Sequence, residues 1–140
     1  MPTLALDVGS RRIGIAVSDP GERFALPLRV LERATVHEDL QAIVDLAAEH
    51  GATTIVVGDP VRLTGERGPA ADKIDEFCRV LGRAFAGTIA RVDERLTTAQ
   101  ATRSLIAADV SRKRRKQLVD GMAAALILET FLAGKRTAGR

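Results

Sequence analysis

The sequence lacks tryptophan and tyrosine, and its aromatic residues are four phenylalanines. Base-stacking platforms are built from aromatic side chains, so stacking is not the main way in which this chain would bind nucleic acid. The single cysteine, Cys78, excludes an internal disulfide framework and a cysteine-based zinc cluster. Because Cys78 falls on the apolar stripe of an expected helix, we interpret it as a core thiol, with an intermolecular disulfide as the alternative.

Long apolar runs are missing too, and none approaches the roughly 20 residues that a membrane-spanning helix needs. The apolar stretch near the N-terminus is interrupted by Asp7 and has no basic flank, so it is not typical of a signal peptide. We therefore expect a cytoplasmic protein without a membrane segment. The length of 140 residues suits one compact domain over residues 1–140, with a mobile tail over residues 134–140.

Acidic charge is scarce at the C-terminal end. Residues 101–140 carry 9 basic and 3 acidic side chains, whereas residues 1–100 carry 12 basic and 15 acidic ones. Much of the excess is RKRRK, residues Arg112–Lys116, which we call the basic run. It suits a polyanion such as DNA or RNA, because binding would release counterions. Without a catalytic site nearby, such a run is more often a solvated face.

Hydrophobic periodicity predicts the elements in chain order. Strands are expected over residues 3–8, 13–18 and 24–32 as an antiparallel meander, with Pro27 at an edge or a bulge. A capping box of Thr35 and Glu38 opens a helix that ends at Gly51. Later strands and helices alternate over residues 53–57, 69–85, 88–92, 97–108 and 117–132. Mobile segments are expected over residues 58–68, 109–116 and 134–140.

This order predicts an α/β fold. Three antiparallel strands followed by strands joined through helical crossovers give a central mixed sheet, with three antiparallel strands, then two parallel strands, and helices on both faces.

Asp7 is out of place in its strand. It lies within the apolar stretch LALDV, where a lone buried carboxylate costs several kcal/mol unless a cation, a metal or hydrogen-bond donors compensate for it. The residue therefore needs a partner that its sequence neighbours do not supply.

Two further acids share this feature. Asp93 and Glu94 follow the last strand, and period-two alternation puts Glu94 on the face of Ala90 and Val92, with Asp93 as its substitute. Asp120 heads a helical face that continues with apolar residues at the i+4, i+7 and i+11 positions, Ala124, Ile127 and Phe131.

Asp7, Glu94 and Asp120 could converge although they are far apart in sequence. Clustered carboxylates repel one another unless a divalent cation neutralises them. Ligation by oxygen alone favours Mg²⁺ or Mn²⁺, as one ion or two, over zinc, and the histidines, His37 and His50, lie on a surface-type helix. Such a site supports hydrolysis of a phosphodiester, which predicts a nuclease.

Each of these acids also has a structural interpretation, as a satisfied polar group. Asp19 lies in a Pro-Gly turn and Asp59 precedes a proline, so we interpret both as turn formers. Arg95 is either a salt-bridge partner or a phosphate contact.

Four blocks resemble one known family: LALDVGSRRIGIAVSD, IVVGDPVRLTGERGPAA, VDERLTTAQA and RRKQLVDGMAAALILETFL. In this order they are similar to the YqgF (RuvX) family of pre-16S rRNA nucleases, which is related to RuvC-type Holliday junction resolvases. The resemblance implies an RNase H-like fold, a divalent-metal site and a role in maturing the 5′ end of small-subunit rRNA. The family's acids match Asp7, Glu94 or Asp93, and Asp120. One departure is Asp59, where the family usually has an apolar residue; it is either an added ligand or, as we favour, a local turn variation.

The expected partner is a nucleic acid: pre-rRNA or other RNA, or branched or single-stranded DNA, bound by a monomer or a homodimer. The candidate contacts are Arg11, Arg12, Arg95, Arg112, Lys113, Arg114, Arg115 and Lys116. The first alternative is a junction-cutting DNA endonuclease, which would need a dimer with paired sites. The second is a ribosome-assembly factor without catalysis. An ATPase is a remote third, because the DxG hairpin is similar to that of actin-like kinases but no phosphate loop is present.

Overall fold

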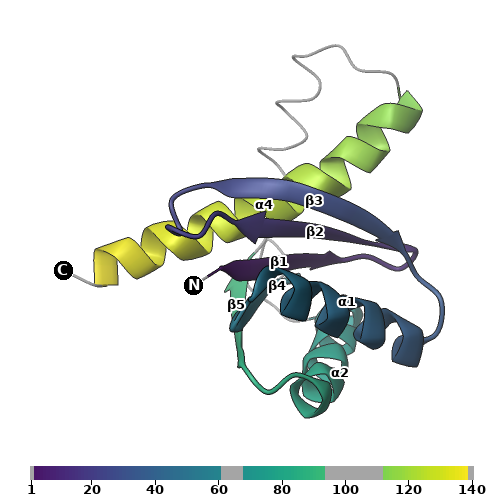
Figure 1. Ribbon diagram of the computed structural model, residues 1–140. Coiled ribbons are helices and arrows are strands. Elements are labelled where there is room, and N and C mark those ends of the chain that lie inside the picture. The colour runs from purple at the N-terminus through teal and green to yellow at the C-terminus, as the bar shows by residue number, and fades with distance from the viewer. Residues whose placement is uncertain (1, 61–67, 94–111, 139–140) are drawn as a thin grey trace.

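The computed structural model describes residues 2–60, 68–93 and 112–138, with the backbone alone for residues 112–120 and 136–138. Five strands and three helices lie in this part of the chain (Figure 1). They are β1 (Thr3–Val8), β2 (Arg12–Ser18), β3 (Ala25–Glu32), α1 (Val36–His50), β4 (Thr54–Asp59), α2 (Pro69–Ala84), β5 (Thr88–Asp93) and α4 (Arg112–Ala138). The expected helix over residues 97–108 lies outside the described residues.

The strands form one mixed sheet in the order β3-β2-β1-β4-β5. β1 pairs antiparallel with β2, and β2 with β3, whereas β4 runs parallel to both β1 and β5. This topology confirms the predicted meander followed by parallel strands. β1 is the central strand, so its backbone is bonded on both edges.

Helices cover both faces of the sheet, as predicted (Figure 1). On one face, Leu4 and Leu6 of β1 join the larger apolar side chains of α1 and α2 in the first core. On the other face, Ala5 and Ala16 meet α4 in the second core. Small side chains on this second face allow a helix to lie close to the strands.

Pro27 lies at the edge of the sheet and at an irregular point of the ladder. β3 has one neighbour, β2, and the register shifts there, because Ile15 pairs with Arg29 while Ala16 pairs with Pro27. Proline cannot donate a ladder hydrogen bond, so it is tolerated on an edge or at a bulge. Both alternatives predicted for Pro27 are confirmed.

Asp19 shapes the turn between β2 and β3, which confirms it as a turn former. Its carboxylate accepts hydrogen bonds from the backbone N–H groups of Arg23 and Phe24, each at 2.7 Å, and of Gly21 at 3.2 Å. The hydrogen bond from Phe24, followed by those from Arg23 and Gly21, lowers the pKa of Asp19 below its usual value.

The caps of α1 agree with the sequence. The Thr35 side chain accepts a hydrogen bond from the Glu38 N–H at 3.1 Å, and Gly51 ends the helix with φ 66°. Glycine adopts this left-handed conformation without the strain that a Cβ atom would cause.

Helix α4 is longer than predicted at both ends. The expected limits were Gln117 and Leu132, but the helix begins at Arg112 and ends at Ala138. Arginine, lysine and alanine are strong helix formers, so the basic run extends the helix instead of forming an irregular segment. Within the described residues, no helix is both long enough and apolar enough to cross a bilayer.

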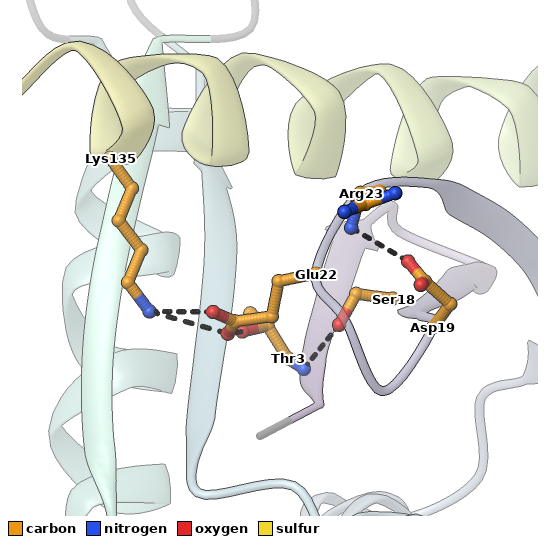
Figure 2. A network of polar contacts seen from close by, with 6 residues as sticks. All are labelled: Thr3, Ser18, Asp19, Glu22, Arg23 and Lys135. Carbon is orange, nitrogen blue, oxygen red and sulfur yellow. Dashed lines mark hydrogen bonds and ion pairs between the residues drawn. The ribbon is translucent and has the colours of Figure 1, made fainter. Parts of the chain in front are cut away.

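A polar network ties the C-terminal end of α4 to the start of the sheet (Figure 2). Lys135 Nζ lies 3.0 Å from Glu22 Oε2, and Glu22 also accepts a hydrogen bond from the Thr3 hydroxyl at 3.1 Å. The Thr3 N–H in turn donates to Ser18 Oγ at 2.7 Å. Burial alone would raise the pKa of Glu22, but the hydrogen bonds from Lys135 and Thr3 lower it overall. The network therefore favours a charged Glu22 that holds α4 in place.

Candidate active site

Asp7 lies near the C-terminal end of the central strand, and its side chain is half-buried. Alternation along β1 puts it on the same face as Ala5, which belongs to the second core beneath α4. The residue opposite Asp7 on β2 is Gly14. On the β4 side the last pair is Leu6 with Val57, so Gly58 is the next residue along β4 beside Asp7. Asp7 is therefore flanked on both neighbouring strands by residues without side chains.

We call these two positions beside Asp7, Gly14 and Gly58, the glycine gap, because neither has a side chain. A side chain at either position would rise from the sheet next to the Asp7 carboxylate. Glycine inside a strand often marks a place where a ligand approaches closely. The sequence analysis missed both residues, although each interrupts a run of β-branched and apolar residues, in RIGIAV and IVVGD.

Two acids end the neighbouring parallel strands on the opposite face of the sheet. Asp59 ends β4, Asp93 ends β5, and the two are partners in the strand register. This face of β5 looks toward α2, because Ile89 packs against the first core and Arg91 pairs with Asp75 of α2. Asp93 thus lies on the α2 side of the sheet, whereas Asp7 lies on the α4 side.

Asp59 is not in a turn. The expectation of a loop from residue 58 is wrong here, because pairing with β5 extends β4 through Asp59.

Burial raises the pKa of the Cys78 thiol, which lies near Asp59. The Arg91 guanidinium opposes this rise, and the negative charges of Asp59 and Asp75 add to it. Cys78 is a protonated free thiol packed against the first core, in agreement with the core interpretation.

Helix α4 crosses the sheet face that carries Asp7 (Figure 1). Ala124 and Ile127 are fully buried, and Phe131 packs against the same core. These residues have the spacing predicted for the inward face, so that face is confirmed C-terminal to Asp120. The side chain of Asp120 and the whole of Glu94 lie outside the described residues.

The basic candidates fall into two groups. Arg11 is exposed in the connection between β1 and β2, and Arg12, the first residue of β2, is half-buried. Arg12 Nε lies 3.9 Å from Glu32 Oε1. The basic run forms the first turns of α4, the end that extends beyond the sheet in Figure 1, with its side chains outside the described residues. Arg95 lies outside them as well.

Within the described ranges, no three histidine, cysteine or carboxylate side chains gather as a metal site. A three-acid centre therefore depends on Glu94 and Asp120 joining Asp7. What the described residues supply is one oxygen ligand beside a gap, and carboxylate oxygen is the donor that Mg²⁺ and Mn²⁺ prefer. The donor chemistry thus fits a hard divalent cation.

Solved structures of low sequence identity share this fold. RuvC of Thermus thermophilus in complex with a Holliday junction substrate aligns over 96% of both chains, with a TM-score of 0.59 and 14% identity. The fowlpox virus Holliday junction resolvase aligns over 96% of this chain and 99% of its own, with a TM-score of 0.55 and 10% identity. These likenesses confirm the RNase H-like fold class.

Sequence comparison identifies the family. A protein of Desulforudis audaxviator, named "Putative pre-16S rRNA nuclease", is 40% identical over 98% of this chain and 97% of its own length. A protein of the same name from Halalkalibacterium halodurans is 46% identical over 94% of this chain and 96% of its own. The family model RuvX, described as Holliday junction resolvase, matches residues 1–134. The chain therefore belongs to the RuvX family.

Proposed function

We propose that this protein is a divalent-metal-dependent nuclease that processes the 5′ end of pre-16S rRNA in the cytoplasm. The coarser statement, that the chain is a nuclease of the RuvX family, follows from the family match and from the curated relatives. The metal, the RNA substrate and the site residues are the proposed parts.

The position of Asp7 is the single observation that carries the proposal. The acid lies in the central strand, on the α4 face and beside two residues without side chains, so neither neighbouring strand places a side chain against its carboxylate. Helix α4, which packs on this face, carries Asp120, and Glu94 directly follows β5 in the sequence.

Asp7, Glu94 and Asp120 would hold one or two Mg²⁺ or Mn²⁺ ions. Asp93 is the weaker substitute for Glu94, because the alternation of β5 puts it on the other face. When bound, the cation supplies Lewis-acid activation of the phosphodiester and neutralises the acids. Arg11 and Arg12, shortly after Asp7 in the sequence, would bind the phosphates that flank the reacting one.

A junction-cutting DNA endonuclease is the second candidate, because the fold is that of the RuvC chain bound to a Holliday junction. The two are separated by a cleavage assay with Mn²⁺ on a 5′-extended 16S rRNA fragment, a single-stranded DNA of the same sequence and a four-way DNA junction. We expect cleavage of the RNA at the highest rate. Symmetric cutting of the junction, by a species with the mass of a dimer, would favour the resolvase instead.

The basic run provides a test of nucleic-acid binding. Replacing both Arg114 and Arg115 with alanine is expected to weaken RNA binding and to reduce the slope of log K against log salt by about 0.7 per lost phosphate contact on a single strand. Binding is measured by fluorescence anisotropy across a range of salt concentrations.

The matched control replaces Arg79 and Arg83 of α2 with alanine, which removes the same charge from a helix on the other face of the sheet. Equal slopes for both double variants would show that net charge, and not the basic run, determines binding.

A further inference from the structure

A tight turn follows Asp7 and leads into β2. Its residues, Gly9–Arg12, which we call the Gly9 turn, close through a hydrogen bond of 2.8 Å from the Gly9 N–H to the Arg12 carbonyl. A Cβ atom at Gly9 would lie 2.9 Å from the same carbonyl oxygen, so only glycine fits without a shift. The turn therefore sets how the chain beyond Asp7 reverses direction into β2.

Arg33, in the connection between β3 and α1, holds this turn at two points. Its backbone N–H donates to the Arg11 carbonyl at 2.9 Å. Its side chain reaches back along the turn, where Nη1 donates to the Gly9 carbonyl at 3.0 Å. A residue far from Asp7 in sequence thus fixes both the beginning and the middle of the turn.

Arg33 is itself held in one orientation. Its Nε lies 3.2 Å from Oδ2 of Asp39, a carboxylate that is only 2% exposed. The other oxygen of Asp39 accepts a hydrogen bond from the Ala34 N–H at 2.9 Å. The guanidinium also lies over the ring of Phe77 of α2, 5.7 Å from its centroid. These contacts leave Arg33 little freedom to release the turn.

We propose that Arg33 is a positioning residue, which acts through the Gly9 turn to fix the Asp7 carboxylate and the Arg11 and Arg12 side chains for metal and phosphate binding. This inference rests on the proposed function. Arg33 lies on the α1 and α2 side of the sheet, so it acts through the backbone and touches neither the metal nor the scissile phosphate. Supporting contacts around metal ligands affect metal affinity by 10–100-fold in other proteins.

The test compares Arg33→Met with Arg33→Lys. Methionine keeps the apolar stem and removes all donors, whereas lysine restores the charge but cannot donate to Asp39 and Gly9 in the planar fork geometry of a guanidinium. We expect both variants to need about 10-fold more Mn²⁺ for half-maximal cleavage. Isothermal titration calorimetry with Mn²⁺ alone should show the same loss, and amide hydrogen exchange at Ser10 and Arg11 should become faster.

The matched control is Arg91→Met. It removes a partly buried arginine from a strand and breaks its ion pair with Asp75 on α2, without touching the Gly9 turn. Its Mn²⁺ affinity and its exchange rates at Ser10 and Arg11 should equal those of the wild type. A second control, Lys73→Met, removes a cation from the cavity of about 660 Å³ that Arg33 also lines.

The outcomes separate the two proposals. If the wild type cleaves RNA and binds Mn²⁺, but Arg33→Lys or Arg33→Met matches it in Mn²⁺ affinity, the positioning role is overturned while the nuclease function stands. If Arg33→Lys keeps the Mn²⁺ affinity of the wild type, the positive charge alone matters and the fork geometry of the guanidinium does not. That result also overturns the positioning role. If the wild type neither binds Mn²⁺ nor cleaves, the proposed function fails and the inference fails with it.

Discussion

Asp7→Asn is expected to lower the rate of Mn²⁺-dependent RNA cleavage by more than about 100-fold, while RNA binding is retained. Asparagine has nearly the same shape but lacks the negative charge that a divalent cation needs. Metal stabilisation of the transition state contributes several kcal/mol, and each 1.36 kcal/mol is a factor of ten in rate. Single-turnover cleavage, with anisotropy for binding, measures both quantities.

The control for this variant is Asp59→Asn. Asp59 ends the neighbouring strand β4, but it lies on the α2 face, so the same chemical change falls outside the glycine gap. We expect cleavage at the wild-type rate, with the same Mn²⁺ requirement. Full activity of Asp7→Asn would refute the catalytic assignment, and a large loss in Asp59→Asn would bring the α2 face into the site.

Asp7→Asn should not destabilise the fold when no metal is bound. In the proposed site Asp7 would be repelled by Glu94 and Asp120, so removing its charge would relieve an unfavourable interaction, and functional sites often carry such a cost. Thermal unfolding without metal should therefore give a midpoint for Asp7→Asn at or above that of the wild type.

Gly87→Ala is expected to reduce the free energy of unfolding by about 3 kcal/mol, at the upper end of the cost of overpacking. Gly87 lies just before β5, where an added Cβ atom would be 2.2 Å from the Thr53 carbonyl oxygen and 2.6 Å from the Phe85 ring. The Thr53 carbonyl cannot easily move, because it accepts a hydrogen bond of 3.0 Å from the Thr88 N–H. Urea denaturation measures the loss.

Gly134→Ala is the matched control, because it is the same substitution in an open place. Gly134 lies inside α4, and among the described residues only its chain neighbours and the backbone of the helix lie within 4 Å of the place that a Cβ atom would take. Alanine is a better helix former than glycine, so we expect a gain of up to about 1 kcal/mol. Equal effects of the two substitutions on the free energy of unfolding would mean that the close contacts around Gly87 do not determine the cost of a Cβ atom there.

The fold was predictable from the sequence where local pattern and tertiary structure agree. Alternation marked the β1–β2 hairpin, Thr35 and Gly51 marked the ends of α1, and Pro27 marked the edge strand. Asp7 was singled out as a candidate for a related reason. A charge inside an apolar strand contradicts its surroundings, and such conflicts tend to occur at functional sites.

What was missed depends on contacts that no local pattern records. Arg33 and Asp39 look like ordinary polar residues before a helix, and only the folded chain brings Arg33 to Gly9. The predicted start of α4 was wrong because the run of like charges was interpreted as a solvated coil. Its residues are good helix formers, and the helix includes them. The choice between Asp93 and Glu94 remains a prediction, since Glu94 lies outside the described residues.

Side chains alternate between the two faces of the sheet along β5, so the face on which Asp93 lies depends on the number of residues before it in the strand. Val92 faces α4 and Asp93 faces α2, so deleting one residue within β5 would carry each following side chain through the sheet to the other side. Asp93 would then lie on the α4 face, in the place that Val92 now holds. A strand of this kind tolerates exchanges of side chains far better than changes of length, and insertions or deletions in this enzyme should be confined to its connecting segments.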